Sequence, residues 1–297
     1  MKRFDAAAST FFALGLLVLA GCEQVPTHGM DPLMPVIDPL TTRGRDGGGK
    51  PLDYAALMRI GTAAQAGGDA STAVGIFRRA AALAPGVPTP FVAAGNALLE
   101  MGQTDEAIVA YNSALTRNER DPEALRALAR AYMMTGKPQL AGQPLSVAYQ
   151  DTPNDPKLLQ LIGVADDLAG QHEEAQARYR RGLELLPGDR ALTLNLALSL
   201  TLTGNYPEAV AILRPLATAV TSSPRERQTL ALIYGLQGNR AGAERMARLD
   251  LNAEATARNL AYYETLRRLS PEARARAIQS ISTQSQTPSK TAELKQR

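Results

Sequence analysis

The side chains of this sequence that could carry chemistry are few and widely separated. Cys22 is the only cysteine in 297 residues, so it can form neither an intrachain disulfide nor a sulfur-ligated metal site. His28 and His172 are the two histidines, and neither has another histidine or a cysteine at ligand spacing. The adjacent acidic pairs at 166–167 and 173–174 point in different directions on a helix. No G-x-S-x-G, P-loop or G-x-G-x-x-G motif is present. We therefore expect no catalytic residue, no metal and no cofactor.

The surroundings of Cys22 indicate export and lipidation. Lys2 and Arg3 give a basic start, and the apolar run at 6–20 is shorter than the roughly 20 residues that a membrane-spanning helix needs. A basic start, a short apolar run and small residues at its end are typical of an export signal. Leu19-Ala20-Gly21-Cys22 resembles the lipobox of bacterial lipoproteins. The alternative is that Cys22 is a small buried hydrophobe.

The lipobox resemblance implies a processed and anchored protein. A signal peptide at 1–21 would be removed, and Cys22 would become the first residue and carry acyl chains such as palmitate. Several chains on one residue hold a protein stably in a membrane, whereas one chain holds it marginally. Glu23 follows the cysteine where inner-membrane lipoproteins often have aspartate. The resemblance thus implies the outer membrane, with the chain on its periplasmic face.

Residues 22–53 differ in composition from the rest of the chain. They are rich in proline and glycine and show neither the helical nor the strand period. The run Gly47-Gly48-Gly49 has no side chains to restrict it, so we predict a flexible tether. The alternative is that the apolar stretch MPVIDPL docks on the folded domain.

From Tyr54 onward the sequence repeats with a fixed period. A glycine recurs every 34 residues, and an alanine follows each glycine five residues later. The glycines are Gly68, Gly102, Gly136, Gly170, Gly204 and Gly238, and the alanines are Ala73, Ala107, Ala141, Ala175, Ala209 and Ala243. A period of this length predicts stacked helix–turn–helix units. Gly95 and Ala107 must be small because the two helices of a unit touch there, and Tyr111 fills the space beside them.

This pattern resembles the tetratricopeptide repeat. The resemblance implies an all-α fold, a right-handed superhelical array of six repeats at 54–257. The stripe of Leu260, Tyr263, Leu266 and Leu269 predicts a helix that covers the open end, within capping helices at 258–281. The polar tail at 282–297 is predicted to be disordered.

The charge balance excludes some partners. With 32 basic and 29 acidic residues the chain is close to neutral, and it lacks the concentrated basic surface of a nucleic-acid binder. The basic run at 267–276 could contact anionic lipid, although a solvated helix face is the alternative. No small-molecule substrate is indicated.

What remains is a surface for another polypeptide. The first helices of such an array line its concave face, and such faces bind peptides or partner helices. In register, the predicted groove contains Arg59, Val92, Asn96, Arg126, Arg130, Met133, Lys157, Leu161, Val164, Leu168, Leu194, Asn195, Leu198, Leu202, Gln228 and Leu232. Its first half is polar and basic and its second half is apolar, which favours a partner with an acidic part and an amphipathic helical part. Alternatively, several of the leucines contact the neighbouring repeat.

A narrower resemblance lies in the later repeats. The stretches LIGVADDLAGQHEEAQARYRRGLELLPGD, LNLALSLTLTGNYPEAVAILRPLA and NLAYYETLRRL, together with the lipobox, resemble the TadD family of lipoproteins. That family belongs to tight adherence (Flp-type) pilus assembly systems, and the resemblance implies a pilotin-like role toward the secretin. The alternatives are a scaffold for type IV pilus secretin assembly, outer-membrane protein insertion or cell-wall synthesis, and an enzyme, for which no catalytic constellation was found.

Overall fold

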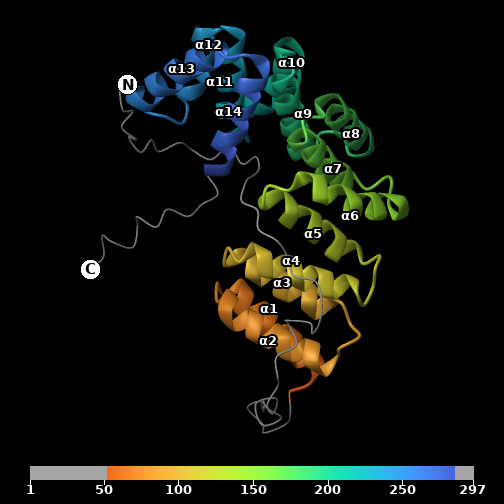
Figure 1. Cartoon of the computed structure of the whole chain (residues 1–297). Helices are drawn as coiled ribbons and strands as arrows, with labels where there is room; N and C mark the ends of the chain where they lie inside the picture. Colours follow the sequence, from red (N-terminus) through yellow and green to blue (C-terminus); the bar gives the residue numbers. More distant parts are fainter. Residues whose placement is uncertain (1–51, 285–297) are drawn as a thin grey trace, which may run out of the picture. The chain divides into compact units, whose positions relative to one another are not determined.

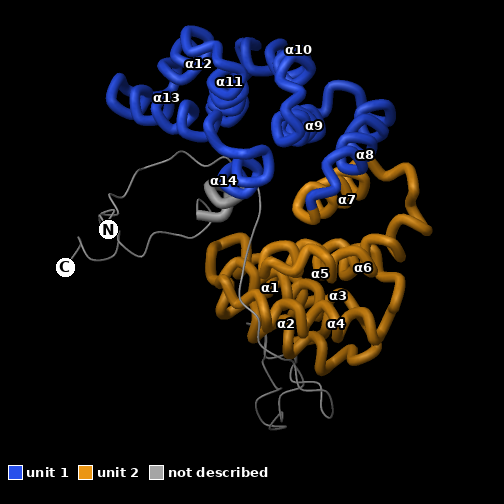
Figure 2. Tube along the Cα trace, turned by 45° about the horizontal axis from the view of Figure 1, so that its top comes forward, with its two compact units in different colours: residues 1–18, 170–297 blue, residues 19–169 orange. Residues whose placement is uncertain are grey.

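The computed structural model describes residues 52–284, and side chains through Ile278 (Figure 1). Within this range the regular structure is entirely helical. The helices fall into two compact units, which Figure 2 colours separately: unit 2 ends at Ala169 and unit 1 resumes at Gly170. The signal peptide, the lipobox with Cys22, the tether up to residue 51 and the tail after residue 284 lie outside the described residues.

Unit 2 consists of stacked helical hairpins. Its helices are α1 (Tyr54–Ala66), α2 (Ala70–Leu83), α3 (Thr89–Glu100), α4 (Thr104–Leu115), α5 (Pro122–Met134), α6 (Pro138–Asp151) and α7 (Pro156–Leu168). Each helix contacts the next one along the chain, and the first helices α1, α3, α5 and α7 also contact one another in order. One apolar core runs through α2, α3, α4 and α5, and side chains of α1 pack against it.

Unit 1 contains the later helices. They are α8 (His172–Leu185), α9 (Arg190–Leu202), α10 (Tyr206–Ala217), α11 (Pro224–Gln237), α12 (Arg240–Ala247), α13 (Ala253–Arg267) and α14 (Pro271–Gln284). The pairs α9–α10 and α11–α12 form hairpins, α8 packs against α9, and α13 packs against both α11 and α12.

The periodic glycines end the first helices as the sequence predicts. Gly68, Gly102, Gly136, Gly170, Gly204 and Gly238 all have positive φ, between 75° and 91°. After α3, the Gly102 amide donates to the Leu99 carbonyl at 2.9 Å and the Gln103 amide to the Leu98 carbonyl at 2.9 Å. Other residues adopt this left-handed conformation at a cost, so glycine fixes where the second helix starts.

Polar caps fix where the first helices begin. Asp121 accepts from the Ala124 amide at 2.8 Å at the start of α5, and Asp189 accepts from the Leu192 amide at 2.8 Å at the start of α9. At α11, Ser223 and Glu226 form a reciprocal capping box. Such caps satisfy amides that a helix leaves without partners. Caps and glycines together determine which side chains each first helix presents.

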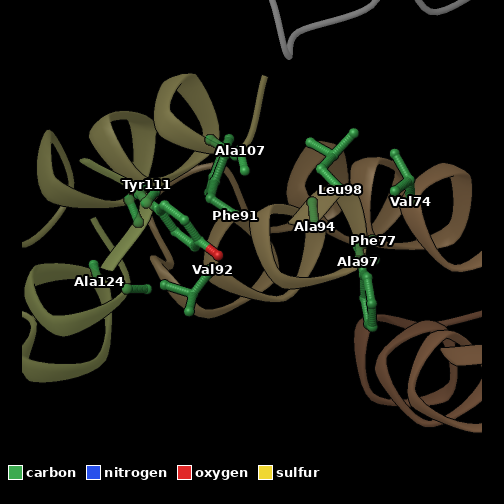
Figure 3. Packing of buried hydrophobic residues seen from close by; sticks show 14 of the residues in the cluster. Val74, Phe77, Phe91, Val92, Ala94, Ala97, Leu98, Ala107, Tyr111 and Ala124 are labelled. Carbon is green, nitrogen blue, oxygen red and sulfur yellow. The ribbon is translucent and has the colours of Figure 1, made fainter. Parts of the chain in front are cut away.

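Small residues meet aromatic rings inside the hairpins, as predicted. Tyr111 and Phe77 are 0 % and 1 % exposed, and Figure 3 shows them inside the packed cluster of unit 2. A Cβ atom on Gly95 would lie 2.5 Å from Cε1 of Tyr111, and one on Gly61 would lie 2.5 Å from Cε1 of Phe77. Only glycine therefore fits at these two points without a shift of the ring.

The C-terminal end differs from the regular pattern. The helix α12 has eight residues, and Ala247 stands where earlier second helices have a larger residue. Tyr263 from α13 instead packs on α11, where a Cβ atom on Gly235 would lie 2.4 Å from its ring. The start of α13 at Ala253 corrects the expected repeat boundary at 257, because Asn252 caps the helix by accepting from the Ala255 amide at 2.9 Å. The end of α14 at Gln284 places 282–284 in that helix and not in the predicted tail.

Candidate protein-binding surface

The structure places the predicted groove residues on the first helices. We call this set the first-helix face: Arg59 on α1; Val92 and Asn96 on α3; Arg126, Arg130 and Met133 on α5; Lys157, Leu161, Val164 and Leu168 on α7; Leu194, Asn195, Leu198 and Leu202 on α9; and Gln228 and Leu232 on α11. The members in unit 2 and the members in unit 1 are two separate sets with different chemistry.

In unit 2 the polar members of the face reach the surface. Arg59, Asn96, Arg130 and Lys157 are exposed, and Arg126 is half-buried. Arg126 is tied to Asp155, the cap of α7, by an ion pair of 3.1 Å. Within residues 52–284, Arg59, Arg130 and Lys157 have no carboxylate partner. Unit 2 thus offers cations that its own described side chains leave unneutralised.

A hydrogen bond orients the polar group on α3. The Tyr111 hydroxyl donates to Oδ1 of Asn96 at 2.8 Å, which directs the Asn96 side chain. Burial raises the pKa of Tyr111 well above its ordinary value of 10.0, and the nearby Arg130 cation opposes that rise. The tyrosine therefore stays protonated and remains a donor. The amide nitrogen of Asn96 can donate to a bound chain, and Arg130 can pair with its carboxylates.

In unit 1 the corresponding face is buried. Leu194, Leu198, Leu202 and Leu232 are between 4 % and 8 % exposed. The polar members Asn195 and Gln228 are also buried, and Gln228 donates to Asp250 at 3.0 Å and to the Ala247 carbonyl at 3.3 Å. These side chains lie in the interior of the folded chain, in contrast to the open apolar groove that the register indicates.

Burial also affects part of the face in unit 2. Val92, Met133 and Val164 are buried, while Leu161 and Leu168 are half-buried. Val92 lies in the core cluster of the first hairpins, and Figure 3 shows it beside that packed group. Val92 is therefore core and not open surface, an outcome that the alternative for the leucines did not include.

The sequence reasoning missed the position of α14. It predicts capping helices at 258–281, and Ser270 caps the last of them, α14, by accepting from the Ala273 amide at 3.2 Å. The helix then contacts α9 as well as α13, and Ile278 joins the cluster that contains Leu202 and Leu232. The apolar residues of α14 were a signal that it packs, but the sequence did not say against what.

The described residues contain few features that suggest other chemistry. No three histidine, cysteine, aspartate or glutamate side chains between residues 52 and 284 come close enough to hold a metal ion. In the same part of the chain, no helix is both long and apolar enough to cross a membrane.

Comparisons with known proteins identify the repeats. Models of the tetratricopeptide repeat match residues 55–86, 92–156 and 168–233, which together make up more than half of the chain. A search of curated protein sequences found no match.

Solved structures show the same fold at low sequence identity. A tetratricopeptide repeat protein from Parabacteroides merdae is 18% identical with a TM-score of 0.59, over 73% of this chain and 86% of that one. Pseudomonas aeruginosa PilF is 18% identical with a TM-score of 0.59, over 70% of this chain and 97% of its own. The anaphase-promoting-complex assembly Cut9–Hcn1 gives the same identity and TM-score, over 71% of this chain and 43% of that one. These structures show the fold, and the matching repeat models show that this chain belongs to the tetratricopeptide repeat family, whose repeats form scaffolds for protein partners.

Proposed function

We propose that this protein is a lipid-anchored scaffold on the periplasmic face of the outer membrane. In this role it binds a protein partner through its first-helix face and assists tight adherence (Flp) pilus assembly. Toward the secretin it acts in a pilotin-like manner. The proposal has three parts, namely partner binding, the membrane anchor and the pilus system, and each has its own support and test.

Partner binding is supported by the exposed polar residues in unit 2. Asn96 and Arg130 stand 34 residues apart at the same register, both exposed, on the contacting helices α3 and α5. Their exposed donors and cation suit a segment that carries carboxylates and free backbone carbonyls. This pair is the observation that carries the proposal, because the Asn96 side chain is oriented by Tyr111 and the exposed Arg130 cation has no carboxylate partner within residues 52–284.

The anchor is supported by the sequence alone. Leu19-Ala20-Gly21-Cys22 follows a basic start and a short apolar run, as in lipoprotein signals. The variant Cys22→Ala is expected to remain unacylated, and to be soluble or retained with its signal in the inner membrane. Metabolic labelling with a palmitate analogue and membrane fractionation check this. Normal labelling and outer-membrane fractionation of the variant would end the lipoprotein proposal.

The pilus role is supported by the resemblance of the later repeats to the TadD family. The test is to delete the gene and measure the heat-stable secretin multimer in the outer membrane, with wild-type and Cys22→Ala complementation. We expect the multimer to disappear on deletion, to return with wild type and to stay low with Cys22→Ala. An unchanged multimer would contradict the secretin role and leave a scaffold for another envelope machine, such as type IV pilus secretin assembly, outer-membrane protein insertion or cell-wall synthesis.

A further inference from the structure

Two apolar members of the first-helix face in unit 1 are covered by a segment of the same chain. Leu202 from α9 and Leu232 and Leu236 from α11 form one buried cluster with Ile278 from α14. We call these three leucines the α9–α11 leucine patch. Ala275 and Ala277 of α14 pack against the same cluster. The C-terminal helix therefore lies where the register places the apolar part of a binding surface.

The position of α14 differs from that of an end cap. A cap that continues the array would cover α13, the last first-helix-like element, on its open side. The helix α14 contacts α13, but it also turns back and contacts α9, which precedes α13 by two first helices (Figure 2). It thus packs on Leu202 and Leu232, which the repeat register assigns to the predicted groove. A helix lying on such a face is the arrangement in which repeat proteins hold a helical ligand.

A single arginine fixes the near end of α14. The guanidinium of Arg274 donates to the Leu266 carbonyl at 3.1 Å and the Leu269 carbonyl at 3.1 Å, at the C-terminal end of α13. It also donates to the Tyr206 hydroxyl on α10 at 2.6 Å. A cation is favourable at the negative end of a helix dipole. Arg274 therefore joins three helices and holds α14 in its turned-back position.

Apart from Arg274, the described part of α14 buries little side-chain surface. Among its side chains described through residue 278, Ile278 is the only one that is buried, at 8 % exposed. By contrast, α13 buries Leu260, Tyr263 and Leu266 at 1–6 % exposed. Hydrophobic stabilisation scales with buried apolar area, so the described part of α14, residues 271–278, is held by less burial than α13. A weakly held element is the kind that detaches by local opening without global unfolding.

We propose that α14 is a resident helix that occupies the α9–α11 leucine patch and must be displaced before a partner helix can bind there. This inference rests on the proposed partner-binding function and assigns its regulation. Residues 268–270 connect α13 to α14, so the resident helix remains at a high effective concentration. A partner competes with it, so the apparent affinity of the partner equals its intrinsic affinity multiplied by the fraction of molecules in which α14 is undocked.

The resident helix also indicates the chemistry of the partner. It presents Arg274 beside Ala275, and Ile278 one turn later on the same helix face. A partner segment that replaces it is an amphipathic helix with an arginine followed by small and branched apolar residues at these spacings. The arginine would take over the carbonyls of α13 and the hydroxyl of Tyr206.

The test uses a fluorescent synthetic peptide of residues 270–284 and the purified full chain. One full chain is wild type, one carries Arg274→Ala with Ile278→Asp, and a matched control carries Arg276→Ala, an exposed residue of the same helix. Anisotropy is expected to give at least about tenfold tighter peptide binding to the double variant than to wild type or to Arg276→Ala. A peptide with Ile278→Asp should bind none of them. Equal binding to all three chains, or no binding to a double variant with wild-type helix content, would overturn the proposal.

A second measurement uses wild type alone and does not depend on the folding of a variant. Hydrogen–deuterium exchange should show the amides of α14 exchanging at least about tenfold faster than those of α13. Equal protection of α14 and α13 would make α14 a fixed core element and contradict displacement. Neither assay contains the pilus partner, so a negative result here leaves the proposed function standing, and failure of the secretin experiment leaves the resident helix standing.

Discussion

One register position of the repeat is exposed on the early first helices and buried on the later ones. In unit 2, Asn96 on α3 and Arg130 on α5 occupy it and are exposed, whereas Val164 on α7 is 8 % exposed. In unit 1, Leu198 and Leu232 occupy the equivalent position and are 4 % and 5 % exposed. The spacing is a multiple of 34 residues throughout, and each of these helices is followed by a glycine with positive φ. Equivalent positions in a repeat array can therefore be either surface or core.

The repeat register determines which side chains belong to the first-helix face, but it does not determine whether they are exposed or buried. A residue in the row is free for a partner only where nothing else in the chain packs on it. For the α9–α11 leucine patch, α14 provides that cover. In unit 2 the cationic members of the first-helix face are exposed, whereas in unit 1 its apolar members are buried. The substitutions below test this difference between the two units.

The largest effect is expected from a charge at the equivalent positions. Leu198→Glu places a carboxylate at a site that is 4 % exposed, and an unpaired buried charge costs about 3–5 kcal/mol. Arg130→Glu, the matched change in unit 2, is at an exposed site and should alter stability by less than about 0.5 kcal/mol. Urea unfolding followed by circular dichroism measures both. Similar midpoints for the two variants would mean that Leu198 is surface in solution.

A smaller effect tests a feature that the units share. Gly95→Ala in unit 2 and Gly235→Ala in unit 1 each bring a Cβ atom to within 2.5 Å of a tyrosine ring. Overpacking of this kind costs about 1–3 kcal/mol, so both variants should melt earlier than wild type. Gly75→Ala on α2 is the control, because its Cβ meets nothing within 4 Å. That control should gain about 0.4–1 kcal/mol of stability. If Gly95→Ala were also stabilising, the close contact of the hairpin helices would be wrong.

The two units also differ in the exposure of an ion pair that joins the two ends of a hairpin. Arg227 pairs with Asp250 in unit 1, where the side chains are 18 % and 9 % exposed, and Arg120 pairs with Asp151 in unit 2, where they are 51 % and 44 % exposed. Because Asp250 also accepts from Gln228, Asp250→Asn should cost about 1.5–3 kcal/mol at neutral pH, and Asp151→Asn should change stability little.

The pH dependence of that cost has a defined sign. Burial by itself raises the pKa of the Asp250 carboxyl, but hydrogen bonds from Arg227 and Gln228 outweigh it and hold the pKa below its ordinary value of 3.8. A depressed pKa stabilises the folded state above the unfolded-state pKa and loses that contribution as pH falls through the folded-state pKa. The gap between wild type and Asp250→Asn should therefore be constant near neutral pH and close below pH 3.8. A gap that widened on acidification would contradict the ion pair.

Much of the fold could be predicted because its determinants are local. Gly102 needs a left-handed turn, Asp121 caps the next helix, and Gly95 is small because Tyr111 lies against it. Each requirement involves residues close in sequence, and the period repeats it. The all-helical hairpin architecture follows from these signals.

The state of the candidate surface could not be predicted, because it depends on contacts between distant residues. Arg274 reaches Tyr206 across 68 positions, and Ile278 joins Leu202 in one cluster. No periodicity encodes such pairings. The short α12 and the early start of α13 were also missed, since Asn252 interrupts the period with a cap that belongs to the next helix.

The most direct measurement of the central claim is site-specific photo-crosslinking in cells. A photoreactive residue replaces Asn96 on the first-helix face, and the matched control replaces Asn112, an exposed asparagine on α4, the second helix of the same hairpin. We predict that position 96 captures one defined polypeptide well above the level from position 112, and that Arg130→Glu reduces the capture. Equal capture from both positions, or none from position 96, would contradict a role for this face in binding a partner.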